Sequence, residues 1–99
     1  MFVSERALHG LYVSPSGKYY MVDVANTWDC GWEGAYAEFD EEIFNEAWYK
    51  DGDTPPTTDD IAEWGEEYGA FPDWEIVSTH HRDPDVAIHN LLRAMKKLP

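Results

Sequence analysis

Alternating apolar and polar positions near the start of the chain predict a β-hairpin. Residues 8–14 and 19–25 are rich in β-branched and aromatic side chains, and a Pro-Ser-Gly turn sequence separates the two runs. In the second run the polar Asp23 falls between Val22 and Val24. Because neighbouring side chains of a strand point to opposite faces, we expect both valines to face a core and Asp23 to face the other way.

The pattern then predicts a third strand followed by a helix. Residues 26–31 form a break, and the aromatic run 32–39 has strand character. Asp40 is a suitable N-cap for a helix over residues 41–49. One face of this helix is apolar at i, i+4 spacing and the other is acidic; the apolar residues are Ile43, Phe44, Ala47 and Trp48.

A second acidic helix is predicted after the turn-rich connector at residues 51–56. Thr57 followed by Asp60 resembles a capping box, so we expect the helix to begin there and to run through Tyr68. Its apolar side consists of Ile61, Trp64 and Tyr68. Gly65 is unfavourable within a helix, and the pattern alone gives no reason for it.

The last third of the chain predicts one strand and one amphipathic helix. Residues 74–79 return to strand character. Asp83 is a plausible N-cap with Pro84 at the first helical position, and the apolar stripe is Ile88, Leu91, Leu92, Met95 and Leu98. The 99 residues therefore predict a single α+β domain, with a mainly antiparallel sheet of three to four strands, two acidic helices and a C-terminal amphipathic helix.

Charge is distributed very unevenly over this predicted fold. The net charge is −13, and the window from Asp23 to Glu75 holds seventeen acids against one base, Lys50. Such a field repels nucleic acid and anionic membranes and attracts surfaces rich in Lys and Arg. An aromatic content of 15 % separates the chain from disordered acidic tails, so we expect it to fold.

Catalytic and metal-binding signatures are weak. No base or oxyanion donor is predicted near the lone Cys30, so we expect a protein that is not an enzyme and that needs no cofactor. A single cysteine cannot form a disulfide within the chain, which favours the cytoplasm. A group of histidines and acids between the last strand and the last helix is an alternative metal site, although its spacing matches no zinc motif; it comprises His80, His81, Asp83, Asp85 and His89. We expect these to be ordinary surface residues.

The segment Thr27-Trp28-Asp29-Cys30-Gly31-Trp32-Glu33, with the strand before it, resembles the front half of small tailed-phage and prophage proteins. The Ala87-Ile88-His89 step is similar to the end of that group, although the histidine there follows the alanine at a longer spacing. About a third of the chain is covered, and the acidic segment 41–68 has no counterpart. In size, charge and aromatic content the chain is also similar to acidic anti-CRISPR and anti-restriction inhibitors. The resemblance implies phage origin and the cytoplasm of a host cell.

Together, charge and resemblance predict an inhibitor that imitates DNA and binds the basic groove of a host nucleic-acid-binding protein, such as a CRISPR effector, with no direct contact to nucleic acid or membrane. Acids three or four residues apart on a helix lie about 5–6 Å apart, a spacing comparable with that of phosphates. The expected binding residues are Glu41, Glu42, Glu46, Asp59, Asp60, Glu63, Glu66 and Glu67, with Trp64 or Tyr68 as an anchor. Two alternatives stay open: a solvated acidic face without a partner, and a phage structural, assembly or regulatory module that docks through Trp28, Trp32 and Trp48.

Overall fold

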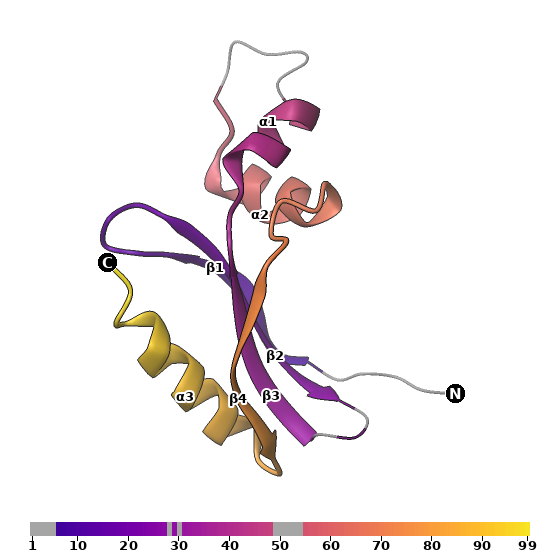
Figure 1. Cartoon of the computed structure of the whole chain (residues 1–99), viewed down its shortest axis with the longest axis vertical. Coiled ribbons are helices and arrows are strands. Elements are labelled where there is room, and N and C mark those ends of the chain that lie inside the picture. The colour runs from indigo at the N-terminus through magenta and orange to yellow at the C-terminus, as the bar shows by residue number, and fades with distance from the viewer. Residues whose placement is uncertain (1–5, 28, 30, 49–54) are drawn as a thin grey trace.

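The computed structural model describes residues 6–27, 29, 31–48 and 55–99. Figure 1 shows a four-stranded sheet with one helix lying along its side and two helices beyond one of its ends. In chain order the elements are β1 (Arg6–Val13), β2 (Tyr19–Thr27), β3 (Gly31–Glu38), α1 (Glu41–Trp48), α2 (Thr58–Glu67), β4 (Trp74–His81) and α3 (Pro84–Met95). The predicted α+β fold, with its order of elements, is confirmed.

The sheet is antiparallel throughout and follows the order of the chain, β1-β2-β3-β4. Val22 and Val24 are buried on one face, and Asp23 lies between them on the other face, as predicted. The predicted break at residues 26–31 begins too early. Asn26 and Thr27 continue β2 and pair with Trp32 and Gly31, so the hairpin closes with a much shorter connection than the polar sequence indicates.

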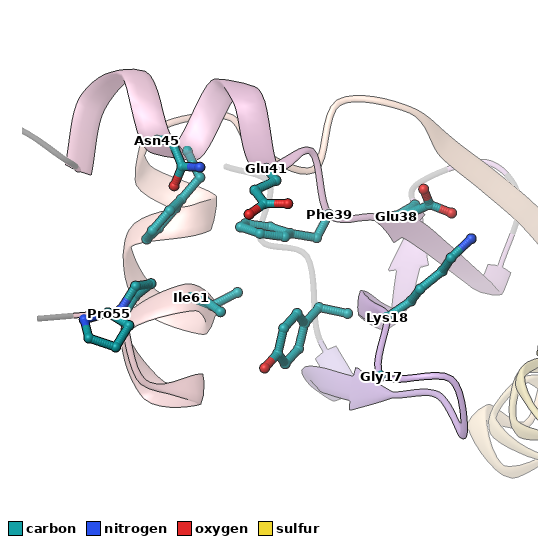
Figure 2. A pocket seen from close by; sticks show the side chains of 11 residues that line it. Gly17, Lys18, Glu38, Phe39, Glu41, Asn45, Pro55 and Ile61 are labelled. Carbon is teal, nitrogen blue, oxygen red and sulfur yellow. The ribbon is translucent and has the colours of Figure 1, made fainter.

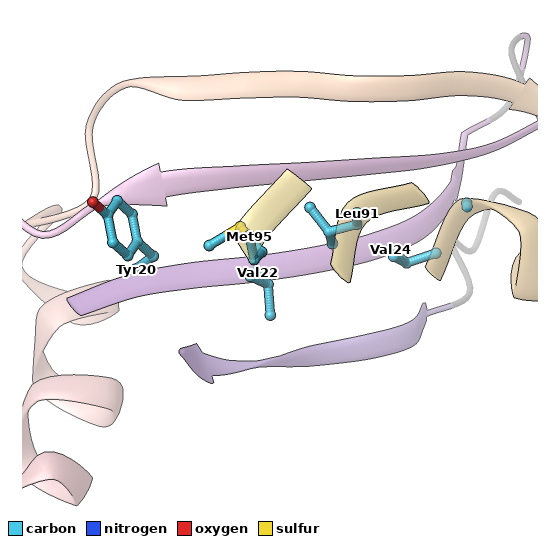
Figure 3. Close-up of a cluster of buried hydrophobic side chains, with 6 residues drawn as sticks. Tyr20, Val22, Val24, Leu91 and Met95 are labelled. Carbon is cyan, nitrogen blue, oxygen red and sulfur yellow. The ribbon is translucent and has the colours of Figure 1, made fainter. Parts of the chain in front are cut away.

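One face of the sheet is covered by α3. Figure 3 shows Tyr20, Val22 and Val24 of β2 beside Leu91 and Met95 of the helix. Leu91, Met95 and Val24 are fully buried. The apolar stripe predicted for the last helix makes this contact, except for Leu92. Leu92 belongs to the predicted stripe, but its side chain is exposed. Burying large apolar side chains on both sides makes this layer one of the two main sources of stability.

The opposite face and one end of the sheet carry a second core beneath α1 and α2. Met21 and Ala37 of the sheet are buried with Phe44 of α1 and Ile61 of α2, and Phe71 closes the cluster. The alternation of β2 therefore serves two cores, with even-numbered residues facing α3 and Met21 facing α1 and α2. Below this cluster, towards the far end of the sheet, Asp23 takes the place of an apolar residue on this face.

Short capping interactions fix where the helices begin. Thr57 Oγ1 accepts a hydrogen bond from the Asp60 amide at 3.2 Å, and Asp60 Oδ2 accepts from the Thr57 amide at 3.0 Å, so the predicted capping box is confirmed. Tyr68 caps the C-terminus of α2 rather than continuing it. Among the described residues, no helix is both long and apolar enough to cross a membrane.

Candidate protein-binding surface

The acids of α1 face away from the core because Phe44 faces into it. Asp40 Oδ1 accepts hydrogen bonds from the amides of Glu42 and Ile43, at 3.0 and 3.3 Å, which starts the helix at Glu41. Glu41, Glu42 and Glu46 are all exposed. The predicted pair Glu42 and Glu46 therefore lies one turn apart on the outer side of a real helix.

The acids of α2 divide into two groups. Asp59, Glu63 and Glu67 are exposed and follow one another at i, i+4 spacing along the helix. Asp60 is used in the capping box, and Glu66 is turned towards the sheet. Two of the eight acids predicted to bind a partner thus make contacts within the protein, although Glu66 stays partly exposed, and the other six are exposed without such a contact among the described residues.

Glu66 joins α2 to the sheet through His9. The Nε2 atom of His9 lies 2.5 Å from Glu66 Oε1, and its Nδ1 atom lies 3.0 Å from Asp23 Oδ1. Arg6 Nε is 3.4 Å from the same Asp23 oxygen. Within the described part of the chain, these are the contacts that acids make with the side chains of Arg, Lys or His at salt-bridge distance. The other predicted binding acids have no basic side chain of the described residues within salt-bridge distance.

The predicted anchors Trp64 and Tyr68 belong to an aromatic contact between α1 and α2. Their rings stack on each other with centroids 5.8 Å apart, and Trp64 also packs against Trp48 of α1 at 6.4 Å. Tyr68 contacts the Phe44 ring at 5.9 Å. Trp64 keeps 37 % of its surface exposed, whereas Tyr68 is half-buried. Only the outer part of Trp64 is therefore available as an anchor.

The aromatic residues of the alternative docking patch do not form one surface. Trp32 packs against the core under α3, and Trp48 stacks on Phe44 in the core under α1 and α2. Trp28 lies outside the described residues. Since Trp32 and Trp48 are half-buried in different cores, the structure does not bring them together.

An acid-lined hollow joins the end of β3 to the start of α1. Its volume is about 350 Å³, and five of its seven described lining residues are acids: Glu38, Asp40, Glu41, Glu42 and Asp73. No base is among them. Sequence analysis missed Glu38 and Asp73 as site residues because they lie 35 positions apart and meet only when the end of β3 pairs with the start of β4.

A second hollow, of about 410 Å³, adjoins the first and shares Glu38, Phe39 and Glu41 with it. Figure 2 shows this space between the turn after β1, helix α1 and the start of α2. Tyr19, Phe39, Phe44 and Ile61 give it apolar walls, and Lys18 extends along its rim on the side of Glu38. The acidic surface is therefore hollowed and partly aromatic rather than a smooth ridge.

Two histidines near the last helix, His81 and His89, have separate partners. His81 Nε2 bonds to the Ser78 hydroxyl, and Arg93 Nη2 donates to His89 Nε2 at 2.8 Å. His80 has a positive φ of 67° in an irregular part of β4. Among the described residues, no group of three His, Cys, Asp or Glu side chains has metal-binding geometry.

Comparison of the chain with protein-family models, with curated proteins and with solved structures finds no match. The motif that resembles phage proteins begins at Thr27, the last residue of β2, and ends at Glu33 in β3; Trp28 and Cys30 lie outside the described residues. Gly31 has a φ of 68°, and a Cβ there would lie 2.7 Å from the His81 carbonyl oxygen. The backbone conformation and the close contact both require glycine here, so this residue of the motif has a structural role. Phage origin stays a prediction from the sequence.

Proposed function

We propose that this protein is an acidic inhibitor that occupies the Lys/Arg-lined groove of a nucleic-acid-binding protein. The observation that carries the proposal is the gathering of Glu38, Asp40, Glu41, Glu42 and Asp73 around one hollow that no described base lines. Basic grooves that hold phosphates present Lys and Arg side chains, which such a hollow accepts. The exposed acids of α1 and α2 extend the same negative field.

The phage resemblance makes the inhibited protein a host defence component, of the CRISPR or restriction type. Occupation of its groove excludes DNA by competition and needs no chemistry. The competing idea of a solvated acidic face predicts no partner at all. Like-charge pairs at i, i+4 spacing, such as Glu63 and Glu67, destabilise a helix by about 0.2–0.5 kcal/mol each, so their presence in α2 favours a binding role.

The test is capture of partners from a bacterial lysate at low salt, followed by competition with duplex DNA for the captured protein. We expect DNA to compete, and affinity to fall by at least about tenfold between roughly 50 and 200 mM salt. The variant Glu63→Gln/Glu67→Gln should weaken binding about tenfold, whereas Asp29→Asn/Asp85→Asn, with the same change of net charge outside α1 and α2, should change it by about twofold or less. Binding that ignores both salt and DNA would refute the proposal.

A further inference from the structure

The start of β4 has an unusual combination of exposure and chemistry. Trp74, Glu75 and Ile76 are three consecutive exposed residues of one strand, and Trp74 and Ile76 retain 46 % and 58 % of their surface. A strand that is exposed at successive residues is accessible on both of its faces. Large apolar side chains exposed together on a monomer commonly mark an interaction site.

The two faces of this short segment differ in character. Ile76 pairs with Ala35 and Trp74 pairs with Ala37, which places both large side chains on the face opposite α3. Glu75 pairs with Tyr36 on the α3 face and accepts a hydrogen bond from its hydroxyl. Since residues of a strand alternate between faces, the segment is apolar on one face and acidic on the other.

A hollow deepens the acidic side. It has a volume of about 450 Å³, and its walls combine three acids with aromatic and apolar residues: Tyr20, Tyr36, Glu38, Asp73, Trp74, Glu75 and Leu98. It shares Glu38 and Asp73 with the hollow at the start of α1. No base is among its described lining residues. A Lys or Arg side chain that enters from the edge of the sheet meets three carboxylates and a tyrosine ring there.

β4 is also an edge strand of the sheet that the described residues form, where its neighbour is β3. Within the described residues, no backbone hydrogen bond joins its outer edge to another segment. The regular pairing with β3 covers Trp74 to Ile76, after which register shifts mark irregularities in the strand. Such irregularities limit pairing at an edge, so the accessible segment suits a short extended peptide better than a long strand.

We infer that the edge of β4 binds an extended segment of a partner protein in which apolar residues alternate with Lys or Arg. The segment adds a fifth strand beside Trp74, Glu75 and Ile76, as in β-strand addition. Its apolar side chains lie against Trp74 and Ile76, and its basic side chains reach Glu75, Glu38 and Asp73. A second copy of this chain is a poor occupant, because its net charge of −13 places like charges along the same edge.

This inference shares Glu38 and Asp73 with the hollow that carries the proposed function, but it does not need the acids of α1 and α2. The probe that tests it is a labelled peptide of alternating lysine and valine, compared with a peptide of equal composition in which the lysines and the valines are grouped. Fluorescence anisotropy at physiological salt measures both affinities. We expect the alternating peptide to bind at least about tenfold more tightly, because only alternation matches the two faces of β4.

Two variants separate strand addition from general charge attraction. Ile76→Lys should weaken binding of the alternating peptide about tenfold, and Val86→Lys, which adds the same charge at an exposed β-branched residue of α3, should weaken it by about twofold or less. Ile76→Thr keeps a high strand propensity, so the variant should fold even if Ile76→Lys does not, and we expect it to weaken binding as well. The helix variant Glu63→Gln/Glu67→Gln should leave this peptide within about twofold, so the two proposals fail separately.

Backbone methylation gives the sharpest outcome. Amides of alternate residues in a strand point to opposite edges, so methylating the amides of the valines or those of the lysines blocks one edge of the peptide at a time. Strand addition predicts that one methylated peptide loses binding and the other keeps it. The inference would be overturned if both methylated peptides bound equally, or if the grouped peptide bound as tightly as the alternating one. It would also be overturned if the protein formed a dimer that Ile76→Lys abolishes.

Discussion

The imidazole of His9 in β1 bonds to the carboxylate of Glu66 in α2, with Nε2 and Oε1 2.5 Å apart across 57 positions of sequence. The other ring nitrogen bonds to Asp23, so one side chain links the open face of the sheet to the second acidic helix. A protein with so many exposed acids therefore uses one of its few basic groups to hold an acidic helix in place. This link adds to the aromatic contact with α1 in holding α2 in place.

Removing either partner should loosen α2. Because the two side chains are 25 % and 41 % exposed, we expect a double-mutant cycle of His9→Ala and Glu66→Ala to give a coupling energy of about 0.5–1 kcal/mol in urea unfolding. As a control, a second cycle pairs His9→Ala with Glu67→Ala, at the adjacent exposed acid, and should give a coupling energy near zero. Equal coupling in both cycles would mean that His9 senses the general negative field rather than Glu66.

Gly65 is required by a close approach between α2 and the segment after it. A Cβ at this position would lie 2.7 Å from Cε2 of Phe71, whose ring is buried. Alanine gains about 1 kcal/mol of helix propensity over glycine, but overpacking a core typically costs about 1–3 kcal/mol. We therefore expect Gly65→Ala to lower the free energy of unfolding, measured by urea denaturation.

The matched control is Gly10→Ala in β1, where a new Cβ meets no heavy atom within 4 Å. This variant should stay within about 0.5 kcal/mol of the wild type. A gain of stability in Gly65→Ala would show instead that the Phe71 ring moves aside at little cost.

Local patterns predicted the elements well because each pattern has a direct physical cause. The alternation around Asp23 defines β2, and the Thr57-Asp60 pair defines the start of α2, since both depend on neighbours in sequence. Gly65 was the exception: its role depends on Phe71, which a helical pattern cannot reveal. The end of β2 was placed too early because pairing with β3 outweighs the polar character of Asn26 and Thr27.

The candidate surface was only partly predictable for the same reason. Helical spacing identified the exposed acids of α1 and α2, but it could not show that Glu66 bonds to His9. The hollow lined by Glu38 and Asp73 arises from the antiparallel register of β3 and β4, which no local pattern encodes. Long-range pairing thus decides which acids face a partner and which support the fold.

The capping box of α2 offers a test of how the acidic helix is held at its start. Thr57→Ala removes the hydroxyl that accepts from the Asp60 amide, and we expect a loss of about 1 kcal/mol in thermal or urea unfolding. Thr58→Ala, one position later and exposed, removes a similar hydroxyl outside the box and should cost about 0.5 kcal/mol or less. Similar losses in both variants would indicate that the cap contributes little.

Tyr36 provides a spectroscopic probe of the acidic hollow beside β4. Its hydroxyl donates to the Glu75 carboxylate, and this bond, with burial and the nearby negative charge, raises the pKa of Tyr36 from 10.0 to about 12. The folded state favours the neutral phenol, so the contribution of this pair to stability is complete below about pH 10 and is lost as the pH rises towards about 12.

Titration of the Tyr36 ring signals by NMR should therefore show this phenol ionising near pH 12 rather than near pH 10. Glu75→Gln removes the charge that opposes ionisation, so the pKa of Tyr36 should fall back towards 10.0, while Glu33→Gln, at an acid on the other face of β3, should leave it near 12. Since Glu75 also faces the hollow proposed to accept a basic side chain, an alternating peptide with arginine in place of lysine, which stays charged at this pH, should draw the carboxylate away from Tyr36 and lower this pKa as well. An unchanged Tyr36 titration in the saturated complex would place the peptide elsewhere on the protein, because a cation beside Glu75 must weaken the negative field that the phenol experiences.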